Sequence, residues 1–314
     1  MRVLVTGARG KVGAATVASL LDAGHDVTGC DLSTPVFEAG PPGGARYVQA
    51  DLTDAGSAFA VVRGHDAVIH AAAIPEPTQG APHVVLANNL MATFNALEAA
   101  VRLGVPRFVH VSSETVPGMA FAEREFVAPY APIDEELEPR PQDPYALSKL
   151  FGERLMDAAV DRADISCVSA RPSWVQWEGN YERNVGPYVR DPALPSASFW
   201  SYIDAYDLAG ALRLAAEADV RGHEVVFVVS PDNSTGRPLA ELVRSHHGDA
   251  VELRPTERED AAGISGARAQ RVLGWRPTRS WRDYLDGAGR LRPEARGRLE
   301  RGETGVQRGR AALA

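Results

Sequence analysis

Lysine is almost absent from this sequence. It occurs only at Lys11 and Lys149, so all but two of the 33 Lys and Arg residues are arginine. Such a bias is typical of an arginine-preferring genome, in which exposed lysines drift to arginine. Position 149, four residues after Tyr145, nevertheless keeps a lysine.

Cysteine and long apolar runs are also scarce. Only Cys30 and Cys167 are present, each in an apolar, strand-like run, which excludes a Cys-x-x-Cys zinc or redox motif. No run reaches the ~18 apolar residues of a membrane span, and the first residues enter a strand without a signal peptide. We expect two buried thiols, no metal site, no membrane contact and a cytoplasmic protein.

The net charge argues against a general nucleic-acid-binding protein. The formal net charge is −8, whereas a general nucleic-acid-binding protein normally carries a basic face. We therefore expect no nucleic-acid partner. The 314 residues suffice for one large α/β domain or two coupled ones around a substantial core.

Short β-branched runs alternate with helical stretches over the first 170 residues. This alternation predicts a doubly wound parallel sheet with helices on both faces. The expected strands are 2–6, 26–30, 46–50, 67–71, 107–111 and 165–170, and the expected helices are 11–24, 54–64, 82–104 and 143–162. In the third helix Leu86, Leu90, Phe94, Leu97 and Val101 form one apolar stripe.

After Arg171 the regular alternation of strands and helices gives way to a stretch rich in aromatic residues, proline and glycine. Loops and short elements are expected first, then helices at 207–218, 236–247 and 265–275 and strands at 223–230 and 250–255. The Arg/Gly-rich tail, 290–314, has little apolar content and is expected to be disordered.

Three glycines separate the first strand from the first helix. Gly7, Gly10 and Gly13 are spaced G-x-x-G-x-x-G, which fits either an ordinary turn or a loop that brings backbone N–H groups to a pyrophosphate. Asp31 ends the second strand, where a carboxylate accepts hydrogen bonds from ribose hydroxyls and repels a 2′-phosphate. Arg9 would favour that phosphate. We give Asp31 more weight and predict NAD.

Other strand ends supply the remaining expected cofactor contacts. Asp51 is expected near the adenine, small residues after His70 let the cofactor pass, and His70 itself is expected to be a satisfied interior histidine. The predicted cofactor-binding set is Gly7, Arg9, Gly10, Lys11, Val12, Gly13, Asp31, Asp51, Leu52, Ala71, Ala72, Tyr145 and Lys149.

Tyr145 and Lys149 lie four residues apart in a segment that begins with Asp143 as N-cap and Pro144. A solvated helix face would show the same pattern. However, Ser113 ends the fifth strand, at the sheet edge where ligands bind. Ser113 would hold a substrate hydroxyl, Tyr145 would take its proton, and the Lys149 ammonium would lower the pKa of the Tyr145 phenol.

Together these motifs resemble the extended short-chain dehydrogenase/reductase family, the NAD-dependent epimerases and dehydratases. They are "TGARGKVG", Asp31, "DLTD", "HAAA", "NNLMATFNALEAA", "HVSSETVPG", "YALSK", "SARPSWV" and "LGWRP", across about residues 1–285. The resemblance implies Ser113, Tyr145 and Lys149 as catalytic residues, a structural role for Asn89, and a homodimer through the helices near 84–103 and 143–162. It also implies a Rossmann domain at 1–172, completed by about 201–230, with a substrate cap from 173–200 and 231–289.

The sequence departs from this family at three places. Glu114-Thr115 replaces the Asp-Glu pair of the dehydratases, which makes dehydration an unsuitable reaction. Pro117 stands where epimerases usually have Tyr, and "RPSWVQW" lacks the Asn that often meets a nucleotide sugar. The stretch "GNYER" is similar to uronate dehydrogenases, in which an arginine grips a carboxylate. Arg183 either does this or is a solvent-exposed arginine.

The function expected from these features is hydride transfer at a sugar hydroxyl. An NAD-dependent nucleotide-sugar epimerase is the leading hypothesis, and an NAD-dependent dehydrogenase of a free sugar acid is the alternative. A regulator that binds the cofactor without catalysis is a third reading, disfavoured by the intact Ser113, Tyr145 and Lys149. The expected substrate contacts are Glu114, Thr115, Ser173 and Arg183.

Overall fold

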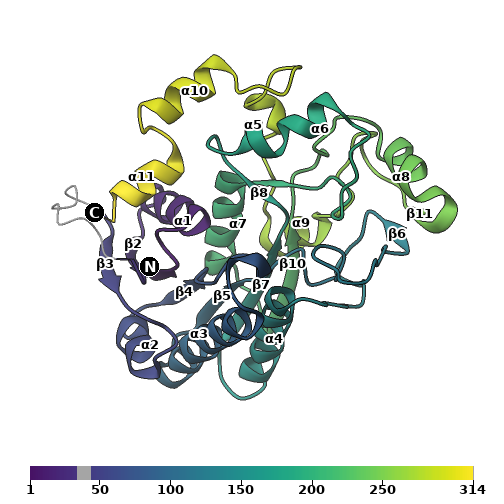
Figure 1. Ribbon diagram of the computed structural model, residues 1–314. Coiled ribbons are helices and arrows are strands. Elements are labelled where there is room, and N and C mark those ends of the chain that lie inside the picture. The colour runs from purple at the N-terminus through teal and green to yellow at the C-terminus, as the bar shows by residue number, and fades with distance from the viewer. Residues whose placement is uncertain (34–43, 314) are drawn as a thin grey trace.

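A seven-stranded parallel sheet forms the centre of the computed structural model, which describes residues 1–33 and 44–313 (Figure 1). The strand order is β10-β7-β5-β4-β1-β2-β3. The strands are β1 (Arg2–Thr6), β2 (Asp26–Asp31), β3 (Arg46–Gln49), β4 (Ala67–His70), β5 (Arg107–Val111), β7 (Ser166–Pro172) and β10 (His223–Val228). The predicted Rossmann-like α/β fold is confirmed.

Helices cover both faces of the sheet, as the alternation predicted. On one face lie α1 (Lys11–Asp22), α7 (Ala205–Glu217) and α9 (Ala267–Leu273). On the other lie α2 (Ala55–Val62), α3 (Pro82–Leu103) and α4 (Pro144–Val160). Both cores are built from aliphatic and alanine side chains, and Cys30 and Cys167 are buried as free thiols in the second core.

Small elements from before and after β7 in the chain lie outside the central sheet. Two-stranded sheets pair β11 with β6 and β8 with β9. These elements are β6 (Tyr130–Ala131), β8 (Val175–Gln176), α5 (Tyr181–Asn184), α6 (Gly186–Arg190), β9 (Ile203–Asp204), α8 (Leu239–His247) and β11 (Glu252–Leu253), with short 3-10 turns at Pro77–Gln79, Gly248–Ala250 and Trp281–Asp283. An apolar cluster that includes Phe199, Trp200 and Ile264 binds several of them together.

The Arg/Gly-rich tail is ordered, contrary to the sequence prediction. Residues 293–311 contain α10 (Pro293–Glu300) and α11 (Gly305–Ala311), and α11 lies against α1 (Figure 1). Three small contacts explain this. Leu313 is buried against Gly29, Gly309 meets the Ala14 carbonyl, and Thr304 caps α11. The low apolar content of the tail led to the prediction of disorder. A few well-placed small residues nevertheless suffice to dock it on the protein.

The helix α3 has the length and composition of a membrane span, and it is the one such helix in the described part of the chain. Half of its apolar window is buried inside the protein. The alanine-rich side of α3 faces the core, whereas Phe94, from the stripe noted in the sequence, is 41% exposed.

Candidate active site

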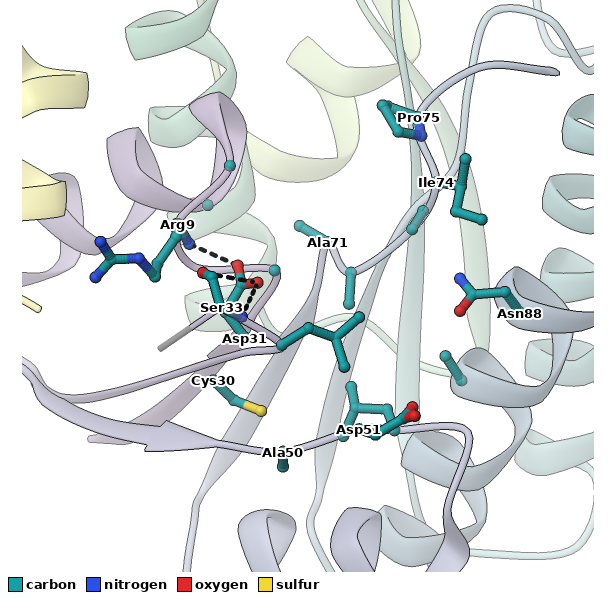
Figure 2. A pocket seen from close by; sticks show the side chains of 18 of the residues that line it. Arg9, Cys30, Asp31, Ser33, Ala50, Asp51, Ala71, Ile74, Pro75 and Asn88 are labelled. Carbon is teal, nitrogen blue, oxygen red and sulfur yellow. Dashed lines mark hydrogen bonds between the residues drawn. The ribbon is translucent and has the colours of Figure 1, made fainter. Parts of the chain in front are cut away.

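A cavity of about 580 Å³ opens at the carboxyl ends of β1, β2 and β4 (Figure 2). This is the point where the strand order reverses, and where open α/β sheets bind ligands. Every predicted cofactor residue except Tyr145 and Lys149 lines it. Other lining residues were not predicted individually, because neither their residue type nor their place in a motif pointed to a contact with the cofactor: Cys30, Leu32, Ser33, Ala50, Thr53, Ala73, Ile74, Pro75, Asn88 and Ala92.

The glycine loop forms one wall of this cavity. Gly7 has φ +62°, and a Cβ there would lie 2.7 Å from the Ala72 main-chain nitrogen. A Cβ on Gly13 would collide with the Gly7 carbonyl oxygen. Gly10 is the N-cap of α1, so the N–H groups of the first helical turn are left for a ligand. A larger residue at Gly7 or Gly13 would push the loop away from the backbone that it packs against.

Asp31 and Arg9 meet at the far end of the cavity (Figure 2). The Arg9 main-chain N–H donates to Asp31 Oδ2 at 2.9 Å, and the Ser33 N–H donates to Oδ1 at 3.3 Å. Arg9 Nη1 is buried and has no hydrogen-bond partner among the described residues. The Arg310 guanidinium in α11 donates to the Arg9 carbonyl at 2.9 Å, so the last helix supports the loop.

At the ends of the other strands, hydrogen bonds hold the side chains and backbone in place. The Ala72 N–H donates to Thr6 Oγ1 at 3.2 Å. His70 is fully buried between Thr6 and Thr93, at 2.9 and 3.2 Å, so it is the satisfied interior histidine that was predicted. Asp51 accepts from the Thr53 N–H and hydroxyl, and the N-cap of α2 is Asp54.

Tyr145 and Lys149 occupy successive turns of α4, close to the end of β5. Asp143 accepts hydrogen bonds from the N–H groups of Tyr145 and Ala146, both at 2.9 Å, which confirms the predicted N-cap. Lys149 Nζ lies 5.6 Å from the Tyr145 ring centre and donates to the Val111 carbonyl at 2.7 Å. The Ser113 hydroxyl interacts with the Tyr145 phenol. The structure thus brings the three predicted catalytic residues together.

The pKa values differ from the sequence expectation. Burial raises the pKa of Tyr145 to about 12, and the hydrogen bond with Ser113 acts in the opposite direction. Burial also lowers the pKa of Lys149 to about 8, opposed by the charge of Glu153. The pKa of Tyr145 is therefore raised and not lowered as expected, because loss of water around the phenol is the largest cause.

The four expected substrate contacts fall into two groups. Glu114 is buried and accepts a hydrogen bond from the Ser173 hydroxyl at 2.5 Å, and burial raises its pKa to about 8. Thr115 donates to Ser113 Oγ from both its N–H and its hydroxyl, at 3.1 and 3.0 Å. Arg183 stands apart: it is exposed on α5 and donates to Asn184 at 3.2 Å.

Comparison with known proteins agrees with this geometry. The model of the NAD dependent epimerase/dehydratase family matches residues 3–230. A UDP-glucose 4-epimerase of Streptomyces lividans is 27% identical over 89% of this chain and 92% of its own length. A uronate dehydrogenase of Pseudomonas syringae pv. tomato is 30% identical over 74% of this chain and 76% of its own.

A solved structure shows the same architecture. MoeE5, in complex with UDP-glucose and NAD, superimposes with a TM-score of 0.67 at 25% identity, covering 96% of this chain and all of that one. The family match spans the sheet, the glycine loop and the Ser-Tyr-Lys cluster. The chain belongs to the NAD-dependent epimerase/dehydratase family.

Proposed function

We propose that this enzyme moves a hydride between NAD and a carbinol carbon of a sugar, with epimerisation of a nucleotide sugar as the leading reaction. The observation that carries the proposal is the meeting of Ser113, Tyr145 and Lys149 beside a glycine-lined cavity. The relative that acts as a UDP-glucose 4-epimerase is similar over nearly the whole chain, which supports this reaction.

The residues present fit the dinucleotide. The α1 N-terminus and the glycine loop would hold the pyrophosphate, because glycine at 7 and 13 lets the loop pack closely against neighbouring backbone and leaves the first N–H groups of α1 for a ligand. Asp31 would accept hydrogen bonds from the adenosine ribose, and Asp51 would face the adenine. When bound, NAD supplies the nicotinamide ring that accepts and returns a hydride.

Proton transfer is assigned to three side chains. Ser113 would hold the reacting hydroxyl, Tyr145 would take its proton, and Lys149 would stabilise the phenolate. Because burial places the pKa of Tyr145 at about 12, the phenol needs positive charge close by to release its proton near neutral pH. An arginine would not replace Lys149 here. The compact ammonium donates to a single buried carbonyl, and a planar guanidinium would not fit that contact.

The substrate would lie against Glu114, Thr115 and Ser173. With a pKa of about 8, Glu114 is mostly protonated at neutral pH and can offer a hydrogen bond to a sugar oxygen. No second acid follows it, because Thr115 occupies that place, and this argues against loss of water from the substrate.

Net oxidation of a free sugar acid is the second candidate. The similarity to a uronate dehydrogenase favours it, and Trp174 occupies the place where the family often has an Asn that meets a nucleotide sugar. Arg183 would then pair with the substrate carboxylate, since its guanidinium is exposed and its charge acts on Lys11, which lines the cavity.

One assay separates the two reactions. The enzyme is mixed with NAD and either UDP-hexoses or hexuronic acids, and the absorbance at 340 nm is followed together with the product. An epimerised sugar nucleotide without net NADH supports the leading reaction, and NADH equal to the sugar acid consumed supports the second. Neither product, from a folded enzyme that binds NAD, would refute sugar hydride transfer.

We also propose a cytoplasmic homodimer. Val84, Met91 and Phe94 on α3 and Phe151 on α4 are 41–46% exposed, on two helices that pack against each other. Large apolar side chains concentrated on one helix pair are typical of an interface between subunits. The buried free thiols, Cys30 and Cys167, suit a reducing compartment.

A further inference from the structure

Three consecutive residues at the end of β5 meet three successive turns of α4. The Val111 carbonyl accepts a hydrogen bond from Lys149 Nζ at 2.7 Å. The Ser112 hydroxyl donates to Glu153 Oε1 at 2.6 Å. Ser113 interacts with Tyr145. Because 145, 149 and 153 are spaced by four, they share one face of the helix, and two hydrogen bonds, from Lys149 and to Glu153, fix this face to the end of the strand.

Glu153 forms a buried ion pair with Arg171. The Arg171 guanidinium on β7 donates to both carboxylate oxygens, at 2.8 Å each, and both side chains are 4% exposed. With the Ser112 bond, the carboxylate accepts three hydrogen bonds, which is how a charge survives in an apolar interior. Together with the Ser112 hydrogen bond, the pair links α4 and β7 to the end of β5, one helical turn after Lys149.

The groups around Lys149 leave it dependent on this carboxylate. Tyr145 and Glu153 face it from α4, His70 from β4 and His110 from β5, with Arg171 on β7 behind Glu153. Both histidines are fully buried, and burial together with the Lys149 charge lowers their pKa values, so they are neutral. The negative charge that supports the ammonium against burial is that of Glu153.

We propose that Glu153 and Arg171 are positioning residues, which keep Lys149 as an ammonium ion and hold Tyr145 in register with Ser113. The effect of this arrangement on catalysis rests on the proposed function, but the protonation state of Lys149 does not. A purely structural ion pair is the competing explanation, since apolar residues of similar volume can often replace such a pair without loss of stability.

The scarcity of lysine makes a direct measurement possible. Protein labelled with ¹³C,¹⁵N-lysine carries only two labelled side chains, and Lys11 serves as the internal reference. NMR of the lysine Cε and Nζ resonances, without cofactor or substrate, follows each titration separately. We expect Lys149 to titrate at about 8. A lysine this buried without a nearby carboxylate would titrate at about 5–6.

The informative variant is E153M/R171M, which replaces the pair by side chains of similar volume. We expect the Lys149 titration to move down by about 1 pH unit or more, while that of Lys11 stays unchanged. E153Q alone is the weaker variant, because it leaves the Arg171 guanidinium buried without its partner. The control is Arg154→Gln, which removes an exposed pair with Asp157 on the same helix and should change neither titration.

Two results would overturn the proposal. One is an unchanged Lys149 titration in folded E153M/R171M. The other is a Lys149 midpoint below 7 in the unaltered protein, which decides the matter even if no variant folds. The turnover of E153M/R171M should fall at least about tenfold at pH 7 with NAD affinity retained. If the titration shifts but no sugar is turned over by the unaltered enzyme, the proposed function fails and the positioning role stands.

Discussion

The main-chain N–H of Arg9 donates a hydrogen bond to the Asp31 carboxylate, while the Arg9 side chain leaves one guanidinium nitrogen without a partner in the described structure. The loop therefore binds to the residue that would exclude a 2′-phosphate, and beside it carries a group that would accept one. We therefore expect the preference between NAD and NADP to depend on the charge of Asp31.

Asp31→Asn should raise the ratio of kcat/KM for NADP to that for NAD by about tenfold or more, equivalent to ~1.4 kcal/mol. The amide removes the repulsion of the phosphate but keeps an acceptor for the Arg9 N–H. Steady-state kinetics with both cofactors measure it. Asp26→Asn, at the other end of β2 in an exposed pair with Arg46, is the control. An unchanged ratio would show that Asp31 does not select the cofactor.

Tyr145→Phe should reduce turnover by a factor of about 10²–10⁴ and leave the Kd for NAD nearly unchanged. The phenol oxygen is the proposed proton acceptor, whereas the ring can keep its packing. Turnover and fluorescence titration with NAD give the two quantities. Tyr130→Phe, which removes a hydroxyl bonded to Asp134 at 2.8 Å outside the cavity, should keep full activity. A fully active Tyr145→Phe enzyme would refute the mechanism.

The raised pKa of Glu114 predicts a pH-dependent stability. Between the unfolded value of 4.5 and the folded value of about 8, the folded state holds a proton that the unfolded state has lost. The contribution of Glu114 to stability is therefore fully present below pH 4.5 and is lost as the pH rises through 8. Glu114→Gln imitates the protonated form at every pH.

Thermal unfolding of wild type and Glu114→Gln should consequently agree at pH 5 and diverge at pH 9, where the variant melts higher. Each kcal/mol corresponds to about 2–4 °C in Tm for a domain of this size class. Glu138→Gln, an exposed carboxylate, is the control. Parallel curves at all pH values would mean that Glu114 is ionised in the folded protein at pH 7.

Leu313→Ala should destabilise the protein by about 2–5 kcal/mol, because Leu313 is 1% exposed and packs on Gly29. It should also weaken NAD binding, since α11 supports the glycine loop through Arg310. Urea unfolding and NAD titration test both effects. Arg308→Ala, in the same helix with an exposed pair to Asp22, should cost at most about 1 kcal/mol. Wild-type NAD affinity in Leu313→Ala would separate the tail from the cofactor site.

Phe94→Lys should convert the proposed dimer to a monomer, because it places a charge in the exposed apolar region of α3 and α4. Sedimentation velocity or light scattering gives the mass. Phe121→Lys, at a similarly exposed position away from these helices, is the control. A wild-type enzyme that sediments as a monomer at micromolar concentration would refute the dimer outright.

The sequence allowed the sheet and the nucleotide loop to be predicted, because both leave local signatures. Gly7 and Gly13 occupy positions where a Cβ does not fit, and Asp143 precedes a helix that it caps. The order of the central strands follows from the family resemblance and the right-handed crossovers of such sheets.

Long-range contacts were beyond prediction from the sequence. The docking of α11 on α1 depends on Gly309 and Leu313, which carry no period and lie some 290 residues from their partners. The state of Tyr145 was also missed. A spacing of four residues shows that an ammonium is near a phenol, but it does not show how much water both lose.

The docking of α11 has a consequence for how this protein is made. The glycine loop proposed to bind the nucleotide is encoded within the first 13 residues, yet one of its supports is Arg310. When the ribosome has synthesised all strands of the sheet, it has not yet synthesised Arg310. The predicted nucleotide-binding domain, expressed alone up to residue 172, would consequently lack this support of the glycine loop, and the gene is a poor choice for dissection into separate domains.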